Sequence, residues 1–486
     1  MKLHSSPHCC FRLSPLLIAL FLAFSARAED RPNVVLVMSD DQGWGQTGYN
    51  GHPLLKTPNL DAMAEAGIRF NRFYAGASNC SPTRASVLTG RSNDRTGVQT
   101  HGYPLRRQEK TIAQALKAAG YATGHFGKWH LNALRGPGVP VLEDDPLHPG
   151  VFGFDTWVSV SNFFDLHPIM SREGEFEEFS GDSSEIAVAE ALKFIKENQD
   201  GPVFAVVWFG TPHSPFMANA GDMAGFEHLE ESERNQLGEL VAMDRAVGTM
   251  RAGLRELGIE ENTVLWFNSD NGGLRNWGSK TVGGLRGFKN QVYEGGIRVP
   301  AVVEWPGRIA PGQQSDVPAV TMDIFPTIGE ILGLPKSAYL DPIDGVSLVP
   351  AFNGNRDPRA KPIPFRRIDG GAVIDNDWKI VGPDLEVDKF ELYNLADDPT
   401  ETTDLYAERP IQAARMMALW RAFDASRLSS IAGNDYVERM VGPDPVGREN
   451  GVFWWELPQY KTHLEAWSKR PEFEDYLKRY FKSLEK

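Results

Sequence analysis

The sequence predicts an α/β fold, with a large, mostly parallel sheet sandwiched by helices and a smaller C-terminal subdomain built on an antiparallel sheet. Over the first two thirds of the 486 residues, short apolar runs alternate with amphipathic helical segments, the order typical of a parallel sheet covered on both faces. The runs themselves are almost continuously apolar, as in strands that are buried on both sides. Beyond residue 335 the apolar runs become shorter and are separated by Asp, Gly and Pro, which favours antiparallel hairpins.

The first strand covers residues 34–38, Val-Val-Leu-Val-Met, and ends abruptly at Ser39-Asp40-Asp41. The first helix follows Thr57-Pro58 and ends before Gly67, since Pro suits the first helical turn and Gly the position after the last. The remaining elements expected here are helices over 111–119, 183–198 and 240–254, and strands over 204–209, 263–267 and 299–305.

The smaller C-terminal unit is predicted from three short strand-like runs, over residues 372–374, 378–381 and 390–393. We therefore divide the chain into a catalytic α/β domain over 29–335 and a C-terminal α+β subdomain with a tail over 336–486. The residues after about 405 have no pattern that predicts a role.

The N-terminal residues have the pattern of a secretory signal peptide. Lys2 and Arg12 precede an apolar run over 16–24, and Ala26-Arg27-Ala28 places small residues two apart. We expect cleavage after Ala28, and export to the periplasm or the extracellular space. No later run approaches the roughly 20 apolar residues of a membrane helix, so no membrane span is expected.

The charge balance argues against a nucleic-acid partner. The chain has 50 Lys and Arg against 64 Asp and Glu, a formal net charge of −14. A surface of this sign repels a phosphate backbone, and no local basic patch offsets it.

Two pairs of oxygen-bearing side chains predict a cation site. Asp40 and Asp41 follow the first strand, and Asp270 and Asn271 follow the strand over 263–267. Ligands of open α/β sheets bind beyond the carboxyl ends of the strands, and an all-oxygen set suits Ca²⁺ or Mg²⁺. Either pair alone is more simply explained as a turn or a helix cap.

A set of basic side chains accompanies the acidic pairs. Lys128 and His130 lie two apart in Gly-Lys-Trp-His-Leu, so in an extended stretch both would face the same side. His213 lies between two prolines at a strand end, and Arg84 and Lys289 lie in glycine-bearing segments. Each could be an ordinary surface charge, but cations that face a metal site indicate an anionic, tetrahedral substrate.

After the expected cleavage the chain keeps a single cysteine, Cys80, so it can form no internal disulfide. A buried cysteine that packs as a small hydrophobic residue is one explanation. The other comes from its surroundings, Cys80-Ser-Pro-Thr-Arg84, followed by Leu-Thr-Gly-Arg91. This stretch closely resembles the signature of the type I, formylglycine-dependent sulfatases, of the alkaline phosphatase-like superfamily. Further motifs of that family occur in its order across most of residues 30–400.

The resemblance implies a modified residue and one metal ion. A formylglycine-generating enzyme, as partner during maturation, would oxidise Cys80 to Cα-formylglycine. One Ca²⁺ per chain would be held by the modified residue and by the two acidic pairs. By their matches to the family's motifs, the implied metal residues are Asp40, Asp41, Cys80, Asp270 and Asn271, and the implied catalytic residues are Cys80, Arg84, Lys128, His130, His213 and Lys289. Thr83, Asn132 and Phe288 depart from the family's commoner residues, and none of them removes a chemical group.

The expected function is that of an exported sulfuric ester hydrolase whose substrate is a sulfated carbohydrate or another sulfate ester. Two alternatives remain at this point. One is a phosphodiester or phosphonate monoester hydrolase on the same scaffold, and the other is a non-catalytic carbohydrate-binding pseudo-enzyme. Candidate sugar contacts are Arg275, Trp277 and Phe288, which flank the matched motifs, although simple packing explains Trp277 as well.

Overall fold

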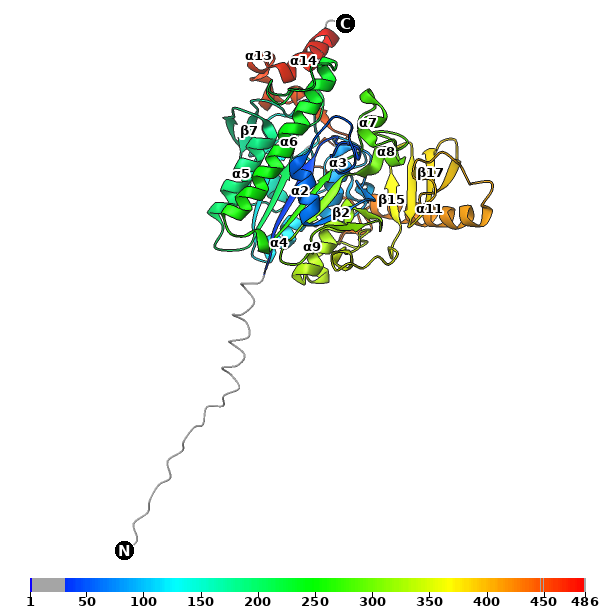
Figure 1. Cartoon of the computed structure of the whole chain (residues 1–486). Coiled ribbons are helices and arrows are strands. Elements are labelled where there is room, and N and C mark those ends of the chain that lie inside the picture. The colour runs from blue at the N-terminus through cyan, green and yellow to red at the C-terminus, as the bar shows by residue number, and fades with distance from the viewer. Residues whose placement is uncertain (2–30, 446, 449, 485–486) are drawn as a thin grey trace.

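The computed structural model describes Met1 and residues 31–445, 447–448 and 450–484. The predicted signal peptide, residues 1–28, lies outside the described residues apart from Met1. A ten-stranded sheet forms the centre of the molecule, in the order β13-β2-β12-β10-β1-β9-β4-β6-β7-β8 (Figure 1). Among the described residues, no helix has the length and apolar character needed to cross a membrane.

Five adjacent strands in the middle of this sheet are parallel to one another, which confirms the predicted fold class. They are β10 (Thr263–Ser269), β1 (Asn33–Ser39), β9 (Val203–Trp208), β4 (Ala122–Lys128) and β6 (Thr156–Val160). Antiparallel pairs join the flanking strands to the sheet, except that the outermost strand β13 pairs in parallel with β2, so that the whole sheet is mixed. The flanking strands are β12 (Ala301–Glu304), β2 (Ile68–Phe70) and β13 (Gln313–Ser315) on one side and β7 (Ile169–Arg172) and β8 (Glu175–Glu178) on the other.

Strand β1 is apolar throughout because both faces of the sheet are covered. Val34, Leu36 and Met38 pack on the side of helices α3 (Cys80–Thr89), α4 (Ile112–Ala118) and α9 (Ile324–Leu332). Val35 and Val37 point to the opposite face, which is covered by α2 (Pro58–Ala66), α5 (Ser183–Glu197) and α6 (Glu231–Glu256). The four helices predicted from the sequence are therefore present. Helix α3 was not predicted.

The strand predicted over 299–305 is in fact two strands in different sheets. Strand β11 (Arg298–Val299) pairs with β3 (Phe73–Tyr74), which also pairs with β14 (Ala319–Val320), while β12 joins the large sheet. Pro300 lies at the break, and it has no backbone N–H to continue a ladder.

The small antiparallel sheet lies beside the large one and consists of β15 (Ile363–Arg366), β16 (Gly371–Asp375), β17 (Trp378–Asp384) and β18 (Lys389–Asn394), backed by helix α11 (Pro410–Ile431) (Figure 1). Strand β15 and helix α11 were not predicted. A buried triad joins this sheet to the larger unit, because Lys379 Nζ lies 3.0 Å from Glu294 in α8 (Glu294–Ile297) and 2.8 Å from Glu401.

The C-terminal tail returns to the large domain. Strand β19 (Val452–Phe453) pairs in parallel with β5 (Leu134–Arg135). The aromatic residues that follow, Trp454, Tyr460 and Trp467, form a buried cluster with Leu134. Their helices are η7 (Trp454–Glu456), α12 (Pro458–Lys461), α13 (Leu464–Trp467) and α14 (Pro471–Leu484), at the end of the molecule opposite α4 and α9 in Figure 1.

Short helical segments complete the structure. They are η1 (Asn93–Thr96), η2 (Pro149–Phe152), η3 (Glu260–Asn262), η4 (Arg275–Trp277), α7 (Ser279–Val282), η5 (Thr321–Asp323), η6 (Lys336–Ala338) and α10 (Val349–Phe352).

Candidate active site

The carboxyl ends of four neighbouring parallel strands bring the predicted site residues together. β1 leads into Asp40 and Asp41, β10 into Asp270 and Asn271, β4 ends at Lys128, and the segment after β9 reaches His213. Backbone hydrogen bonds continue the pairing past the strand ends, since Asp40 N–H donates to Thr211 O (2.9 Å) and Asp270 N–H to Ser39 O (3.0 Å). The site thus lies where open α/β sheets bind ligands.

Cys80 is the first residue of helix α3 and lies at the centre of this cluster. Its side chain is buried, and Sγ lies 3.6 Å from Asp40 Oδ1. Burial raises the pKa of the Cys80 thiol to about 12, against the opposing charges of Lys128 and Lys289. The thiolate is the reactive form of cysteine, so an unmodified Cys80 would be almost wholly protonated and unreactive at neutral pH.

The acidic side chains are bound to one another through the amide groups between them. Asp41 has a left-handed backbone (φ 66°), its N–H donates to Asp270 Oδ1 (3.1 Å), and Asn271 Nδ2 donates to Asp41 Oδ1 (2.9 Å). Burial, followed by the charge of Asp40, raises the pKa of Asp270 to about 7. These contacts fix the orientation of the carboxylates.

Each carboxylate also has a basic partner. Lys128 Nζ donates to Asp40, Lys289 Nζ to Asp41 Oδ2 (2.8 Å), and Arg84 Nη2 to Asp270 Oδ2 (2.8 Å). Burial alone would raise the pKa of Asp40, but Lys128, His213 and Arg84 outweigh burial and hold it below its ordinary value. Three acids are therefore balanced by three bases, so the bare site is close to neutral.

Arg84 is completely buried beneath the cluster. Its Nη1 donates to Lys128 O (3.2 Å), and its guanidinium lies over the Trp208 ring, 5.1 Å from the centroid. These contacts hold the Arg84 side chain in one orientation between Asp270 and the end of β4.

The backbone conformation at His130 differs from the extended one that the sequence predicted. The premise of an extended stretch fails, because β4 ends at Lys128 and His130 has a left-handed backbone (φ 55°). The side chain nonetheless lines the same pocket as Cys80. Among the described residues, neither ring nitrogen of His130 has a hydrogen-bond partner although both are buried. Burial, with added repulsion from Lys128 and Arg84, places its pKa well below the ordinary value, so the ring is neutral.

His213 is held at the edge of the cluster. Its ring stacks on Phe163 (centroids 4.4 Å apart, planes 12° apart), Nδ1 lies 2.7 Å from Ser214 O, and Nε2 lies 3.8 Å from Asp41 Oδ2. Burial, followed by the charge of Lys289, lowers the pKa of His213 to about 4. If Nδ1 donates to Ser214 O, Nε2 is the acceptor of a neutral ring.

A pocket of about 310 Å³ opens onto this cluster. Cys80, His130, His213 and Lys289 lie on its wall, together with residues whose role the sequence analysis missed: Asn79, His101, Arg135, Gly136, Asn162, Phe163, Asn290, Phe453 and Tyr476. The aromatic content of the C-terminal tail was the only sequence signal for Phe453 and Tyr476.

The predicted sugar contacts do not line this pocket. Trp277 packs edge-to-face against Phe216 (5.1 Å), and the Arg275 guanidinium lies over the Phe288 ring (5.7 Å). The other departures from the family's commoner residues also lie off its wall, since Thr83 Oγ1 donates to Ala77 O (3.0 Å) and Asn132 donates to Asp145 (3.1 Å).

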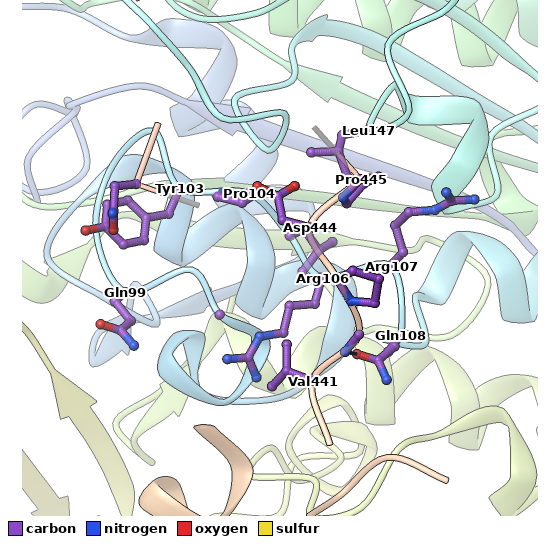
Figure 2. A pocket seen from close by; sticks show the side chains of 15 residues that line it. Gln99, Tyr103, Pro104, Arg106, Arg107, Gln108, Leu147, Val441, Asp444 and Pro445 are labelled. Carbon is purple, nitrogen blue, oxygen red and sulfur yellow. Dashed lines mark hydrogen bonds between the residues drawn. The ribbon is translucent and has the colours of Figure 1, made fainter. Parts of the chain in front are cut away.

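A second, larger cavity of about 410 Å³ lies between residues 97–108 and the segment 441–450 (Figure 2). Arg106, Arg107 and Asp444 lie on its wall. None of the predicted site residues lines it, so the predicted chemistry belongs to the smaller pocket.

The site fits a hard divalent cation. Donor atoms of Asp40, Asp41, Cys80 and His213 all lie within 4.8 Å of one another. The Oδ1 of Asn271 is buried and has no hydrogen-bond partner among the described residues, and a buried amide oxygen ordinarily has one. Carboxylate and amide oxygens are the donors that Ca²⁺ prefers.

Comparisons with known proteins agree with this chemistry. A family model described as sulfatase matches residues 32–334, and one described as the C-terminal part of N-sulphoglucosamine sulphohydrolase matches residues 286–425. The chain is 33% identical to N-acetylgalactosamine-6-sulfatase of Canis lupus familiaris over 68% of each chain. It is 34% identical to human arylsulfatase A over 71% of this chain and 73% of that one. Among solved structures, Ps i-CgsB in complex with k-i-k-neocarrahexaose shares the fold (TM-score 0.73, 24% identity, 89% of this chain and 99% of that one).

Proposed function

Because the chain belongs to the sulfatase family and is a sulfuric ester hydrolase, we propose that it removes sulfate from a sulfated carbohydrate, with formylglycine made from Cys80 as the nucleophile and with one Ca²⁺. The observation that carries this proposal is the position of Cys80, buried at the start of α3, with donor atoms of Asp40, Asp41 and His213 within 4.8 Å and with His130 and Lys289 on the wall of the same pocket. The similarity to N-acetylgalactosamine-6-sulfatases supports a sugar sulfate as the substrate.

The state of Cys80 supports modification over direct use of the thiol. Its raised pKa would leave it protonated, and no described base lies in hydrogen-bond contact with Sγ other than Asp40. Formylglycine would instead supply an aldehyde carbon whose hydrate has two hydroxyl groups, one to bond sulfur and one to lose a proton when sulfate leaves. A formylglycine-generating enzyme is the partner that this proposal requires during maturation, and export by the predicted signal peptide belongs to the same proposal.

Asp40, Asp41, Asp270 and Asn271 would hold Ca²⁺ together with the modified Cys80. Calcium would supply positive charge that favours both the bound sulfate and the deprotonated nucleophile. Because the three acids are already balanced by Arg84, Lys128 and Lys289, an added divalent cation leaves the site with an excess of about two positive charges. That excess attracts a sulfate ester, which carries one negative charge.

Metal removal tests this assignment. We expect EDTA to abolish hydrolysis of nitrophenyl sulfate, and added Ca²⁺ to restore it. The same treatment should leave the circular dichroism spectrum folded, because the basic side chains already pair with the carboxylates. Metal analysis gives the number of ions per chain in the treated protein. Full activity with fewer than one ion per ten chains would show that calcium has no part in the reaction.

The basic side chains have separate proposed tasks in the reaction. Lys128 and Lys289 would offset the charge of the sulfate oxygens, and His213 would add to them once it is protonated; such charge stabilisation is usually the largest contribution to catalysis. Asp270 would accept the proton of the attacking hydroxyl, while Arg84, whose Nη2 donates to Asp270 Oδ2, fixes the carboxylate. His213, with Lys289, gives a proton to the leaving oxygen, and the arrival of the anionic substrate favours its protonated form.

His130 is assigned to the release of sulfate. Its two ring nitrogens have no hydrogen-bond partner among the described residues, and its low pKa keeps the ring neutral. A neutral, unpartnered imidazole on the pocket wall is ready to accept a proton. We propose that it takes the proton of the second hydroxyl and so expels the sulfate.

Paired assays separate this function from phosphoester hydrolysis on the same scaffold. One of the two excess positive charges offsets the single negative charge of a sulfate ester, and the other offsets that of the deprotonated nucleophile. The site therefore suits a monoanionic ester better than a dianionic one. We expect kcat/KM for nitrophenyl sulfate to exceed that for nitrophenyl phosphate, a dianion, by at least about 100-fold, a difference of roughly 2.7 kcal/mol in transition-state binding. A bis-nitrophenyl phosphate diester carries one negative charge, as the sulfate ester does, so it tests recognition of the ester group apart from its charge, and we expect the sulfate to be the better substrate. Equal or greater rates on either phosphate ester would favour the alternative hydrolase. No hydrolysis of any of these esters would favour the pseudo-enzyme.

A further inference from the structure

Part of the wall of the active-site pocket is built from residues that have no part in the proposed chemistry. Besides Cys80, the wall contains Arg135, Asn162, Phe453 and Tyr476. Among the residues whose side chains the structure describes, no Asp or Glu lines the pocket, although the chain as a whole has a formal net charge of −14. The pocket is therefore basic in an acidic protein, beyond what the sulfate alone requires.

Arg135 is a basic residue on this part of the pocket wall. No carboxylate among the described residues lies within ion-pair distance of it, and its buried Nε has no hydrogen-bond partner there. Its guanidinium carbon lies 6.0 Å from the centroid of the Tyr103 ring. Arg135 is half-buried. The buried arginines among the described residues each meet a carboxylate: Arg84–Asp270, Arg91–Asp435, Arg95–Asp344, Arg359–Asp323, Arg427–Asp94 and Arg448–Asp145.

The backbone around Arg135 fixes the position of its side chain. Arg135 ends the short strand β5, and β19 of the C-terminal tail pairs with it so that Phe453 lies opposite Arg135. Gly102 and Gly451 close over the side chain from two sides. A Cβ at Gly102 would lie 2.8 Å from Arg135 Cγ, and one at Gly451 would lie 2.8 Å from Arg135 Nε. Arg135 is half-buried and has no carboxylate partner among the described residues, and a partly buried cation without a partner costs free energy that the anion of a ligand would recover.

Two aromatic residues of the C-terminal tail line the pocket together with Arg135. Phe453, 38% exposed, stacks on Trp455 (centroids 4.6 Å apart, planes 12° apart), and Tyr476 packs against Phe163 at 5.8 Å. Phe163 in turn stacks on His213, so one continuous row of rings joins the proposed catalytic histidine to the tail. Flat apolar faces of this kind suit the carbon side of a sugar ring.

We propose that Arg135 binds a second anionic substituent on the sulfated sugar, either a carboxylate or a second sulfate, while the sulfate to be removed lies at Cys80. This inference rests on the proposed function, and it narrows the substrate class to sugars with two acidic groups. A cavity of about 310 Å³ is at the lower end of the range for ligand sites, which suits one such ring. The C-terminal tail thereby becomes part of the specificity site, through Phe453 and Tyr476.

The test compares matched ligands that differ by one anionic group. We would use a methyl galactoside 6-sulfate, the corresponding 4,6-disulfate, and a 6-sulfated disaccharide with or without a uronate carboxylate. For each pair, kcat/KM is measured on the mature, Ca²⁺-loaded protein, and affinity is measured by calorimetry on the Ca²⁺-loaded Cys80→Ala variant, which does not consume the ligand. The expected ratio between the doubly and the singly charged ligand is about 10- to 100-fold, the value of a charge-assisted guanidinium contact.

Arg135→Met should reduce that ratio to about one, with Arg135→Lys between the two. The matched control is Arg107→Met, because Arg107 is an exposed arginine on the wall of the other cavity (Figure 2). It removes the same charge from the protein and should leave the ratio unchanged. The disulfate and uronate arms show which anion the subsite prefers.

Three results would overturn the inference: a wild-type ratio near one for every pair, an unchanged ratio in Arg135→Met, or an equal fall in Arg107→Met. Hydrolysis of nitrophenyl sulfate, measured alongside, separates this failure from failure of the proposed function. Activity without charge discrimination removes only the Arg135 subsite. Charge-selective binding in the Cys80→Ala variant, with no sulfate hydrolysis by the mature protein, removes only the proposed reaction.

Discussion

Replacing Cys80 with alanine is expected to lower kcat/KM for sulfate esters by at least about 10⁴-fold, as for the loss of a covalent nucleophile. The fold should survive, because the thiol is small and its recorded polar contact is with Asp40 Oδ1 at 3.6 Å. The melting temperature therefore serves as the readout for structure, and we expect a shift of only a few degrees, corresponding to about 1 kcal/mol.

A second arm separates loss of the side chain from loss of its modification. Wild-type protein made in a host without a formylglycine-generating enzyme should be as inactive as Cys80→Ala, because burial leaves the thiol protonated. Activity within tenfold of the mature protein, in either the alanine variant or the unmodified wild type, would show that Cys80 is not the source of the nucleophile.

The His130→Ala variant should lose about 10²- to 10⁴-fold in kcat, the usual contribution of a placed proton acceptor. The imidazole makes no hydrogen bond to the described residues, so removing it breaks no such contact in the folded protein. KM should change less than kcat, because a neutral ring adds little to the binding of an anion. Single-turnover and steady-state rates on nitrophenyl sulfate measure this, and the single-turnover phase should persist while steady turnover stops.

His101 offers the matched control for this variant. It lines the same pocket, and its side chain is exposed. On the simple substrate nitrophenyl sulfate, we expect His101→Ala to change kcat by less than about tenfold, as for a residue outside the proton transfers. Equal losses in the two variants, or a loss in His130→Ala that appears entirely in KM, would contradict the role assigned to His130.

The parts of the fold that the sequence predicted are those in which one physical signal dominates. Continuous apolar runs such as 34–38 and 263–267 correspond to strands β1 and β10. Helix α4 was recognisable from its ends, and Thr111 and Gln114 form a capping box. Helix α3 was not predicted because Cys80-Ser-Pro-Thr-Arg has no amphipathic period, and all ten residues of the helix are buried.

Residues of the candidate site could be predicted from the sequence for a related reason. Polar residues at the ends of apolar strands must meet at one edge of a parallel sheet, so Asp40, Asp41, Asp270 and Asn271 were placed without knowledge of the strand order. His130 shows the limit of such reasoning, because its left-handed backbone depends on loop contacts that periodicity does not encode. Its nearness to Lys128 in sequence was informative, but the extended geometry assumed for it was wrong.

The specificity wall could not be predicted, since it depends on long-range pairing. Arg135 and Phe453 are separated by more than 300 residues, and they meet only because β19 adds to β5. Neither residue lies in a recognisable motif. Their contact follows from burial of the tail's tryptophans against Leu134 and Val139, a consequence of tertiary packing.

The most direct test of the account is the mass of the tryptic peptide that contains Cys80, residues 73–84, from protein purified out of its native host. Oxidation of the side chain to formylglycine replaces sulfur with oxygen and removes hydrogen. The account predicts a peptide lighter than the cysteine form, which reacts with aldehyde reagents and resists thiol alkylation. A peptide found wholly at the mass of cysteine, alkylated in full, in a preparation that hydrolyses sulfate esters would contradict it.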